Sequence, residues 1–125
     1  MISGDTTKGA ALAPVEVARQ IVGTASDKQA ADILLLDIQG VASFADYLII
    51  MSAGSARQMV TLAEELVAAL KQSGVRPHHL EGTTDSGWML LDYFDVVVHI
   101  FSPEQRSFYG LEQVWRRGRQ VVRIQ

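Results

Sequence analysis

Hydrophobic residues near the start of the chain repeat at the spacing of an amphipathic helix. Val15, Ala18 and Val22 recur three to four positions apart, which places them on one helical face. Pro14 precedes them and suits a first helical turn, where the N–H that proline lacks has no intrahelical partner. The pattern predicts a weakly amphipathic helix from Pro14 to about Ser26.

Two continuous apolar runs follow this helix. Residues 33–38 and 47–53 are apolar on both faces, apart from Asp37 and Ser52, as is typical of buried strands. The segment between them, 39–46, is too short to hold a crossover helix. We therefore expect the two strands to be antiparallel neighbours.

The clearest helix signal begins at Ser55. Gln58 stands three positions later and completes a capping box, and an apolar stripe then continues to Leu70 before Gly74 stops it. This helix connects the strand at 47–53 to an extended segment at 78–82. The arrangement predicts a right-handed, parallel β-α-β unit.

The last third of the chain predicts two further strands, at 88–93 and 96–101, joined by a tight turn. Ser102 and Pro103 then combine a cap with a proline suited to the first helical turn. The helix that they begin is expected to end near Gly118. Its expected buried residues are Phe108, Leu111 and Trp115, and the segment beyond it could add a short edge strand through Val121, Val122 and Ile124.

Together these elements predict an α/β fold with a mixed sheet of about five strands and three helices. A chain of 125 residues is long enough for one hydrophobic core and too short for two. We expect a flexible leader at 1–13, one domain at 14–118 and an Arg-containing tail at 119–125.

Composition narrows the function classes. The hydrophobic content of 48% and charged content of 20% are those of an ordinary globular protein. The absence of cysteine removes thiol catalysis, thiolate metal sites and disulfides. No apolar run approaches the roughly 18 residues of a membrane span, and the first residues lack the pattern of a signal peptide. A cytoplasmic protein without a membrane partner is expected.

Charge is unevenly distributed along the chain. The net charge is −3, but residues 116–125 contain four arginines and no acid. Residues 77–115 contain six acids and a single base, Arg106. If the body of the protein has a charged partner, that partner is expected to be basic. The alternative is that this acidic surface serves only solubility.

Metal-binding residues are few. His78, His79, Glu81 and His99 are the available ligands, and strand alternation places only His79 and Glu81 on one face. Two ligands are fewer than the three that a catalytic zinc site needs. His99 lies within an apolar strand, which favours a packed, hydrogen-bonded core histidine. Neither a metal nor a cofactor is expected.

One phosphate-binding signal remains as an alternative. Ser55 and Arg57 lie at the start of the second predicted helix, where free N–H groups and a guanidinium can hold a phosphate. A strand followed by Gly-Ser and a helix also occurs in nucleotidyltransferases. The paired carboxylates that hold the metal ions of those enzymes are missing from the next strand.

Several motifs, in order along about four-fifths of the chain, resemble the ribosomal silencing factor family, also called Iojap-like. They are Asp32-Ile33-x₃-Asp37-Ile38, Ser43-Phe44-Ala45-Asp46-Tyr47, Gly54-Ser55-Ala56-Arg57, Glu81-Gly82, Gly87-Trp88-x₃-Asp92-Tyr93-x-Asp95-Val96-Val97-Val98-His99 and Phe108-Tyr109-x-Leu111-Glu112-x₂-Trp115. The third motif departs from the G-T-S-x-R form of the family but keeps Arg57.

The resemblance implies a non-enzymatic translation regulator with a nucleotidyltransferase-like α/β fold. Members of this family bind ribosomal protein L-fourteen of the large subunit, block joining with the small subunit and repress translation when nutrients are short. Such a factor needs no catalytic group and no direct nucleic-acid contact. The family also forms dimers, so a homodimer is a further possibility.

The resemblance places the ribosomal contact around the segment that contains Trp88. The expected partner-binding residues are Glu81, Trp88, Leu91, Asp92 and Tyr93. Aromatic residues often anchor protein interfaces, and carboxylates complement a basic partner. The alternative is an ordinary core strand flanked by turn acids.

Overall fold

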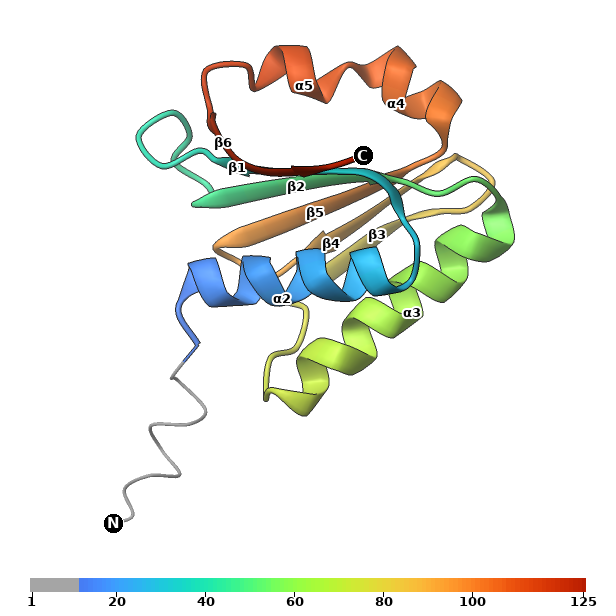
Figure 1. The fold of residues 1–125 in the computed structure, drawn as a ribbon, viewed down its shortest axis with the longest axis horizontal. Helices are drawn as coiled ribbons and strands as arrows, with labels where there is room; N and C mark the ends of the chain where they lie inside the picture. Colours follow the sequence, from blue (N-terminus) through green and yellow to red (C-terminus); the bar gives the residue numbers. More distant parts are fainter. Residues whose placement is uncertain (1–11) are drawn as a thin grey trace.

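The structure is a computed structural model that describes residues 12–125. These residues form a mixed six-stranded sheet with helices on both faces. Figure 1 shows helices α2 and α3 below the sheet and α4 and α5 above it. The strand order is β3-β4-β5-β2-β1-β6. The elements are α2 (Pro14–Asp27), β1 (Ala31–Asp37), β2 (Tyr47–Ser52), α3 (Ala56–Gln72), β3 (His79–Thr83), β4 (Trp88–Asp92), β5 (Val96–Phe101), α4 (Pro103–Tyr109), α5 (Leu111–Val114) and β6 (Arg119–Ile124).

The two long helices begin where the sequence predicts. Ser55 caps α3, its side chain accepting a hydrogen bond of 3.1 Å from the backbone N–H of Gln58. In α2 the Glu16 carboxylate accepts a hydrogen bond of 3.0 Å from the N–H of Ala13. Both helices bury one apolar face, represented by Ile21 and Leu66, against the sheet.

The centre of the sheet consists of the strands that are apolar on both faces. Every residue of β2 and β5 is buried, and the two strands pair in parallel. Strand β1 pairs antiparallel with β2, which confirms the arrangement expected from their short connection. Side chains from both faces of these strands form two core clusters, one on each side of the sheet.

The second strand of the predicted β-α-β unit, β3, does not pair with the first, β2. Strand β3 has the same direction as β2 but lies at the edge, with β4 and β5 between them. The physical reason is burial: β5 is apolar on both faces and takes the place beside β2. All five residues of β3 are exposed, which an edge position tolerates.

Three expectations about the C-terminal segment are corrected or refined. The sheet has six strands rather than about five, because Arg119–Ile124 pairs antiparallel with β1 and realises the expected edge strand. The expected single last helix is broken by Gly110, which adopts a left-handed conformation with φ 56°. Phe108 is 77% exposed rather than buried, because the break changes the helical phase before Leu111 and Trp115, which pack against the sheet.

Most of the segment expected as an Arg-containing tail pairs within the sheet as β6. Most of the expected leader, 1–11, lies outside the described residues. In the part of the chain that the structure describes, no helix has the length and apolar character needed to cross a membrane.

Candidate protein-binding face

Strand β4 contains three of the five predicted binding residues, and Tyr93 follows it directly. Alternation along this segment divides them between the two faces of the sheet. Leu91 is 1% exposed and Tyr93 6% exposed, and both belong to the core cluster beneath α2 and α3. Trp88 packs against the opposite cluster and is half-buried. Trp88 and Tyr93 therefore point to opposite faces of the sheet, as alternation along the strand predicts.

The burial of Tyr93 is nearly complete. Its hydroxyl has no hydrogen-bond partner among the described residues, and burial raises the pKa of this phenol to about 12. Leu91 packs in the same cluster. Both side chains therefore pack into the core beneath the strand.

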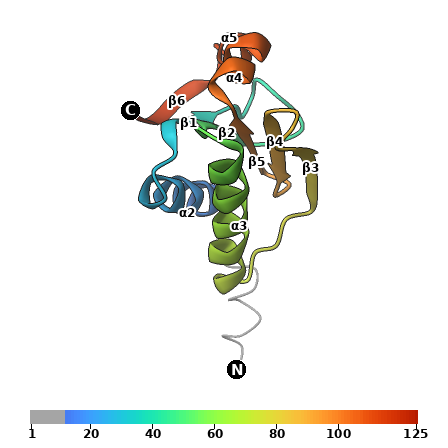
Figure 2. The same ribbon diagram turned by 90° about the vertical axis from the view of Figure 1, so that its right-hand side faces the viewer.

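The other face of β4 carries an aromatic cluster, which we call the aromatic face: Trp88, His99, Phe101 and Tyr109. The indole Nε1–H of Trp88 donates a hydrogen bond of 2.9 Å to Nδ1 of His99. Ring centroids of Trp88 lie 6.0 Å from Phe101 and 5.3 Å from Tyr109. Figure 2 shows α4, which carries Tyr109, on this side of the sheet. Tyr109 is 44% exposed, so the cluster extends from the core to the surface.

Acidic side chains flank the aromatic face. Glu81 is exposed on β3 and pairs in register with Leu90, which places it on the Trp88 side of the sheet. Its carboxylate lies 3.2 Å from Nε2 of His79. Asp92 is half-buried, and one of its oxygens accepts a hydrogen bond of 2.8 Å from the N–H of Phe94. Glu81 is thus more open to a partner than Asp92, which stabilises the turn.

The aromatic face includes residues that the sequence did not single out for binding. His99 is the packed, hydrogen-bonded histidine that its apolar strand predicts, and its contact with Trp88 was not anticipated. Tyr109 and the exposed Phe108 come from the last predicted helix, in which the pattern predicts burial of Phe108 and makes no prediction for Tyr109. Phe108 and Tyr109 are adjacent in sequence, so both rings cannot lie in the centre of one buried helical stripe. This adjacency is the sequence signal that predicts an exposed aromatic ring here.

The backbone beside Glu81 depends on a glycine. Gly82 has φ +89°, and a Cβ there would collide with the carbonyl oxygen of Trp88. We expect Gly82→Ala to lower the free energy of unfolding by about 2 kcal/mol or more, measured by urea denaturation. Gly23→Ala is the matched control, because a Cβ there meets open space in α2 and should stabilise by about 0.5–1 kcal/mol. Equal effects at both positions would contradict this account.

The alternative phosphate-binding residues lie elsewhere. Ser55 caps α3 through the bond to Gln58, and Arg57 is exposed in the first turn of that helix. Within residues 12–125, no three His, Asp or Glu side chains gather closely enough to hold a metal ion.

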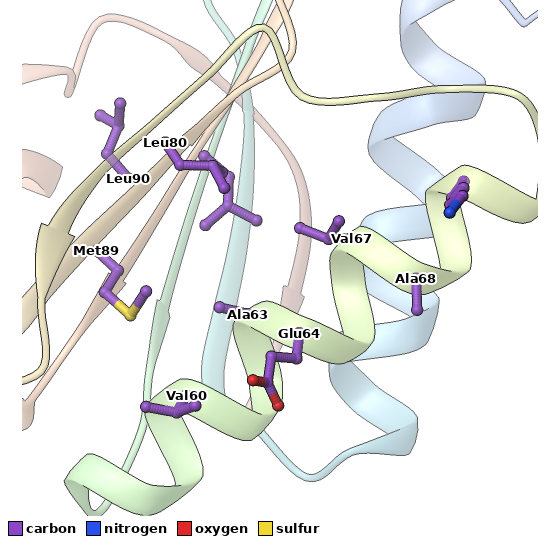
Figure 3. A pocket seen from close by; sticks show the side chains of 10 residues that line it. Val60, Ala63, Glu64, Val67, Ala68, Leu80, Met89 and Leu90 are labelled. Carbon is purple, nitrogen blue, oxygen red and sulfur yellow. The ribbon is translucent and has the colours of Figure 1, made fainter.

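An apolar groove lies on the opposite side of the sheet edge from the aromatic face. Figure 3 shows its lining side chains, which come from α3 and from β3 and β4. Its volume is about 500 Å³, and Leu80, which lines it, is 54% exposed. Glu64 and Lys71 place charges of both signs on its lining, so the groove has no charge preference.

Comparisons with known proteins agree with this architecture. Residues 11–125 match the family model described as ribosomal silencing factor during starvation. The chain is 39% identical over 89 residues to the ribosomal silencing factor of Bacillus subtilis, covering 71% of this chain and 75% of that protein. It is 29% identical over 98 residues to the mouse protein named mitochondrial assembly of ribosomal large subunit protein 1, covering 76% of this chain and 43% of that protein.

Solved structures show the same relationship. A crystal structure of a Chromobacterium violaceum protein superposes with a TM-score of 0.79 at 31% sequence identity, covering 83% of this chain and 87% of that one. The family model spans all but the first ten residues of the chain, and the aligned regions include the strands that carry the aromatic face. The chain belongs to the ribosomal silencing factor family.

Proposed function

We propose that this protein binds ribosomal protein L-fourteen on the large ribosomal subunit, sterically blocks joining with the small subunit and thereby represses translation under nutrient limitation. Membership of the ribosomal silencing factor family supports ribosome-associated repression of translation. The name of the mouse relative supports the large subunit as the site of action. Action on the ribosome is consistent with a cytoplasmic protein.

The observation that carries the proposal is the half-open aromatic face beside an exposed carboxylate. Trp88 and Tyr109 provide aromatic area at the surface, and Glu81 provides a negative charge on the same side of the sheet. Aromatic side chains are enriched at the energetic centres of interfaces. Ribosomal proteins are basic, so an acidic rim would complement such a partner and exclude acidic ones.

Steric exclusion explains the proposed activity without a chemical step. A factor that occupies the joining surface needs affinity and bulk, and its effect ends when it dissociates. Relatives of this chain are named as silencing factors rather than as enzymes. We therefore assign no catalytic residue.

Trp88→Ala tests the assigned face. If the indole is a central anchor, its loss should weaken binding to isolated large subunits by about 30-fold or more, because such anchors contribute about 2 kcal/mol. The measurement is co-sedimentation at physiological salt with a titration of subunits, together with the yield of joined ribosomes. Circular dichroism checks that the variant is folded.

Leu80→Ala is the matched control for that experiment. Leu80 is 54% exposed on the same sheet edge, but it lines the apolar groove on the opposite face. Its loss should leave binding unchanged. Binding that depends on Leu80 and not on Trp88 would assign the ribosomal contact to the groove. A wild-type protein that does not sediment with large subunits would overturn the proposed function itself.

A homodimer is the competing occupant of the aromatic face. If two copies used this face, Trp88→Ala would convert a dimer to a monomer in light scattering. The same variant would then bind large subunits as well as the wild type does. Loss of subunit binding at an unchanged molecular mass supports the ribosomal partner.

A further inference from the structure

The side chain of Trp88 has one polar atom, and the protein uses it internally. Its Nε1–H donates to Nδ1 of His99 at 2.9 Å. In the register of β4 and β5, Trp88 lies opposite Phe101, and His99 lies opposite Leu90. The hydrogen bond therefore joins diagonal neighbours, which long side chains can reach across an antiparallel pair. The indole must extend along the sheet toward His99 to make it.

His99 is suited to accept this hydrogen bond and to keep it. The residue is 8% exposed, and burial lowers the pKa of its imidazole to about 4. At neutral pH the ring is therefore uncharged, with one nitrogen free to accept and the other protonated. Its ring lies nearly parallel to that of Phe101, with the centroids 5.8 Å apart and an interplanar angle of 6°. Packing therefore holds the acceptor in place.

The other neighbours of Trp88 restrict its ring by packing. Phe101 and Tyr109 touch it through apolar surfaces at centroid distances of 6.0 and 5.3 Å. A half-turn of the indole about its bond to Cβ would move Nε1 away from His99 and would also change the apolar contacts of this asymmetric ring. The hydrogen bond adds a directional preference to this packing, since an indole N–H without a partner in this half-buried place carries a desolvation cost.

We propose that His99 is a positioning residue that holds the Trp88 indole in its ribosome-binding orientation by accepting its Nε1–H. The inference rests on the proposed function, because it takes Trp88 as the binding anchor. It also restricts the chemistry of the partner at this point. With the N–H satisfied internally, the indole presents π-surface and hydrocarbon edge, which suit an aliphatic stem or a cation better than a hydrogen-bond acceptor. Glu81 on the same face favours a lysine or arginine there.

Two substitutions at His99 separate the hydrogen bond from the ring. His99→Phe keeps an aromatic ring and removes the acceptor, whereas His99→Asn restores an acceptor oxygen near the position of Nδ1. The dissociation constant for isolated large subunits should rise about tenfold in His99→Phe, as expected for one lost hydrogen bond. In His99→Asn it should stay within about threefold of the wild-type value.

A spectroscopic readout follows the orientation directly in the free protein. The chain has two tryptophans, so its NMR spectrum has two indole N–H signals, and Trp88→Phe assigns them. His99→Phe should shift the Trp88 signal and speed its exchange with solvent, while the Trp115 signal stays in place. His99→Asn should leave both signals near their wild-type positions. Equal loss of affinity in the two His99 variants would contradict a role for the hydrogen bond.

Trp88→Phe completes the test if His99→Phe does not fold. This variant keeps a ring and leaves His99 in place but has no N–H to donate, so it should also bind about tenfold more weakly. In that background His99→Asn should have no further effect, and an additional loss of affinity would show that His99 acts by another route. If Trp88→Phe and His99→Phe both bind with wild-type affinity while Trp88→Ala binds weakly, the role of His99 is overturned but the proposed function is not. Failure of the wild-type protein to bind overturns the proposed function.

Discussion

Replacing Arg106 with alanine is expected to lower the free energy of unfolding by about 3 kcal/mol. Arg106 is 8% exposed and joins three parts of the chain. Its Nη1 donates hydrogen bonds of 2.6 Å to the backbone oxygen of Asp32 and 2.9 Å to Oγ of Ser52. Its Nε donates a bond of 3.1 Å to Glu112. Thus α4 is connected to α5, β1 and β2 through one guanidinium.

The expected loss of stability depends on the groups that Arg106→Ala would leave without their partner. Removing one partner of a buried ion pair costs about 3–5 kcal/mol, because the remaining groups lose their compensation. The lower end applies here, since Asp32 and Glu112 are about one-third exposed and both keep Arg123 within 3.2 Å. The Nη2 atom of Arg106 adds little, lying 3.5 Å from Asp32 without hydrogen-bond geometry.

Chemical denaturation of the wild type, Arg106→Ala and Arg117→Ala measures this effect. Arg117 is exposed at the surface, so its substitution removes the same charge without a buried partner. We expect that control to change stability by less than about 0.5 kcal/mol. A loss below about 1 kcal/mol in Arg106→Ala would show that the buried guanidinium only offsets its own desolvation.

Acidification is expected to destabilise the protein by about 3 kcal/mol between pH 6.5 and pH 4 through His99 alone. Burial lowers the pKa of His99 to about 4 in the folded protein, against an ordinary value of 6.5 in the unfolded chain. Between these values the unfolded chain binds more protons, so its population grows as pH falls. The contribution of His99 is fully present above about pH 6.5 and is lost as the pH approaches 4.

The control is His99→Phe, in which this part of the pH dependence should disappear even if the absolute stability changes. His79→Gln should keep it, because that histidine is exposed on β3. Asp37 titrates below this range, since the backbone N–H of Gln39 lowers the pKa of its carboxyl further. Equal slopes for the wild type and His99→Phe between pH 6.5 and pH 4 would rule out a buried neutral imidazole.

Much of the candidate site follows from local pattern. Alternation along residues 88–93 already assigns Trp88 and Tyr93 to opposite faces, and the apolar strand around His99 predicts its burial. Pattern does not say which face remains accessible. Helices α2 and α3 cover Leu91 and Tyr93, whereas the shorter α4 leaves Trp88 half-buried. The positions of these helices depend on contacts across the whole chain.

The charge distribution changes even more in three dimensions. In the sequence, the arginines of 116–125 form a basic segment apart from an acidic body. In the structure, Arg119 lies 3.1 Å from Asp37 and Arg123 lies 3.0 Å from Asp32. These pairs neutralise the β1 and β6 side of the sheet. The unbalanced acids therefore lie elsewhere, with Glu81 on the edge of the aromatic face.

The sequence by itself determined the α/β class, the limits of the main helices and the two-sided apolar strands at the sheet centre. Those features depend on periodicity, caps and glycines within a few residues of one another. Only the tertiary structure decided that β5 rather than β3 pairs with β2, that the edge strand β6 pairs with β1, and that Trp88 contacts His99. The physical reason is that strand pairing is chosen by burial and register between segments far apart in the chain, which no local pattern encodes.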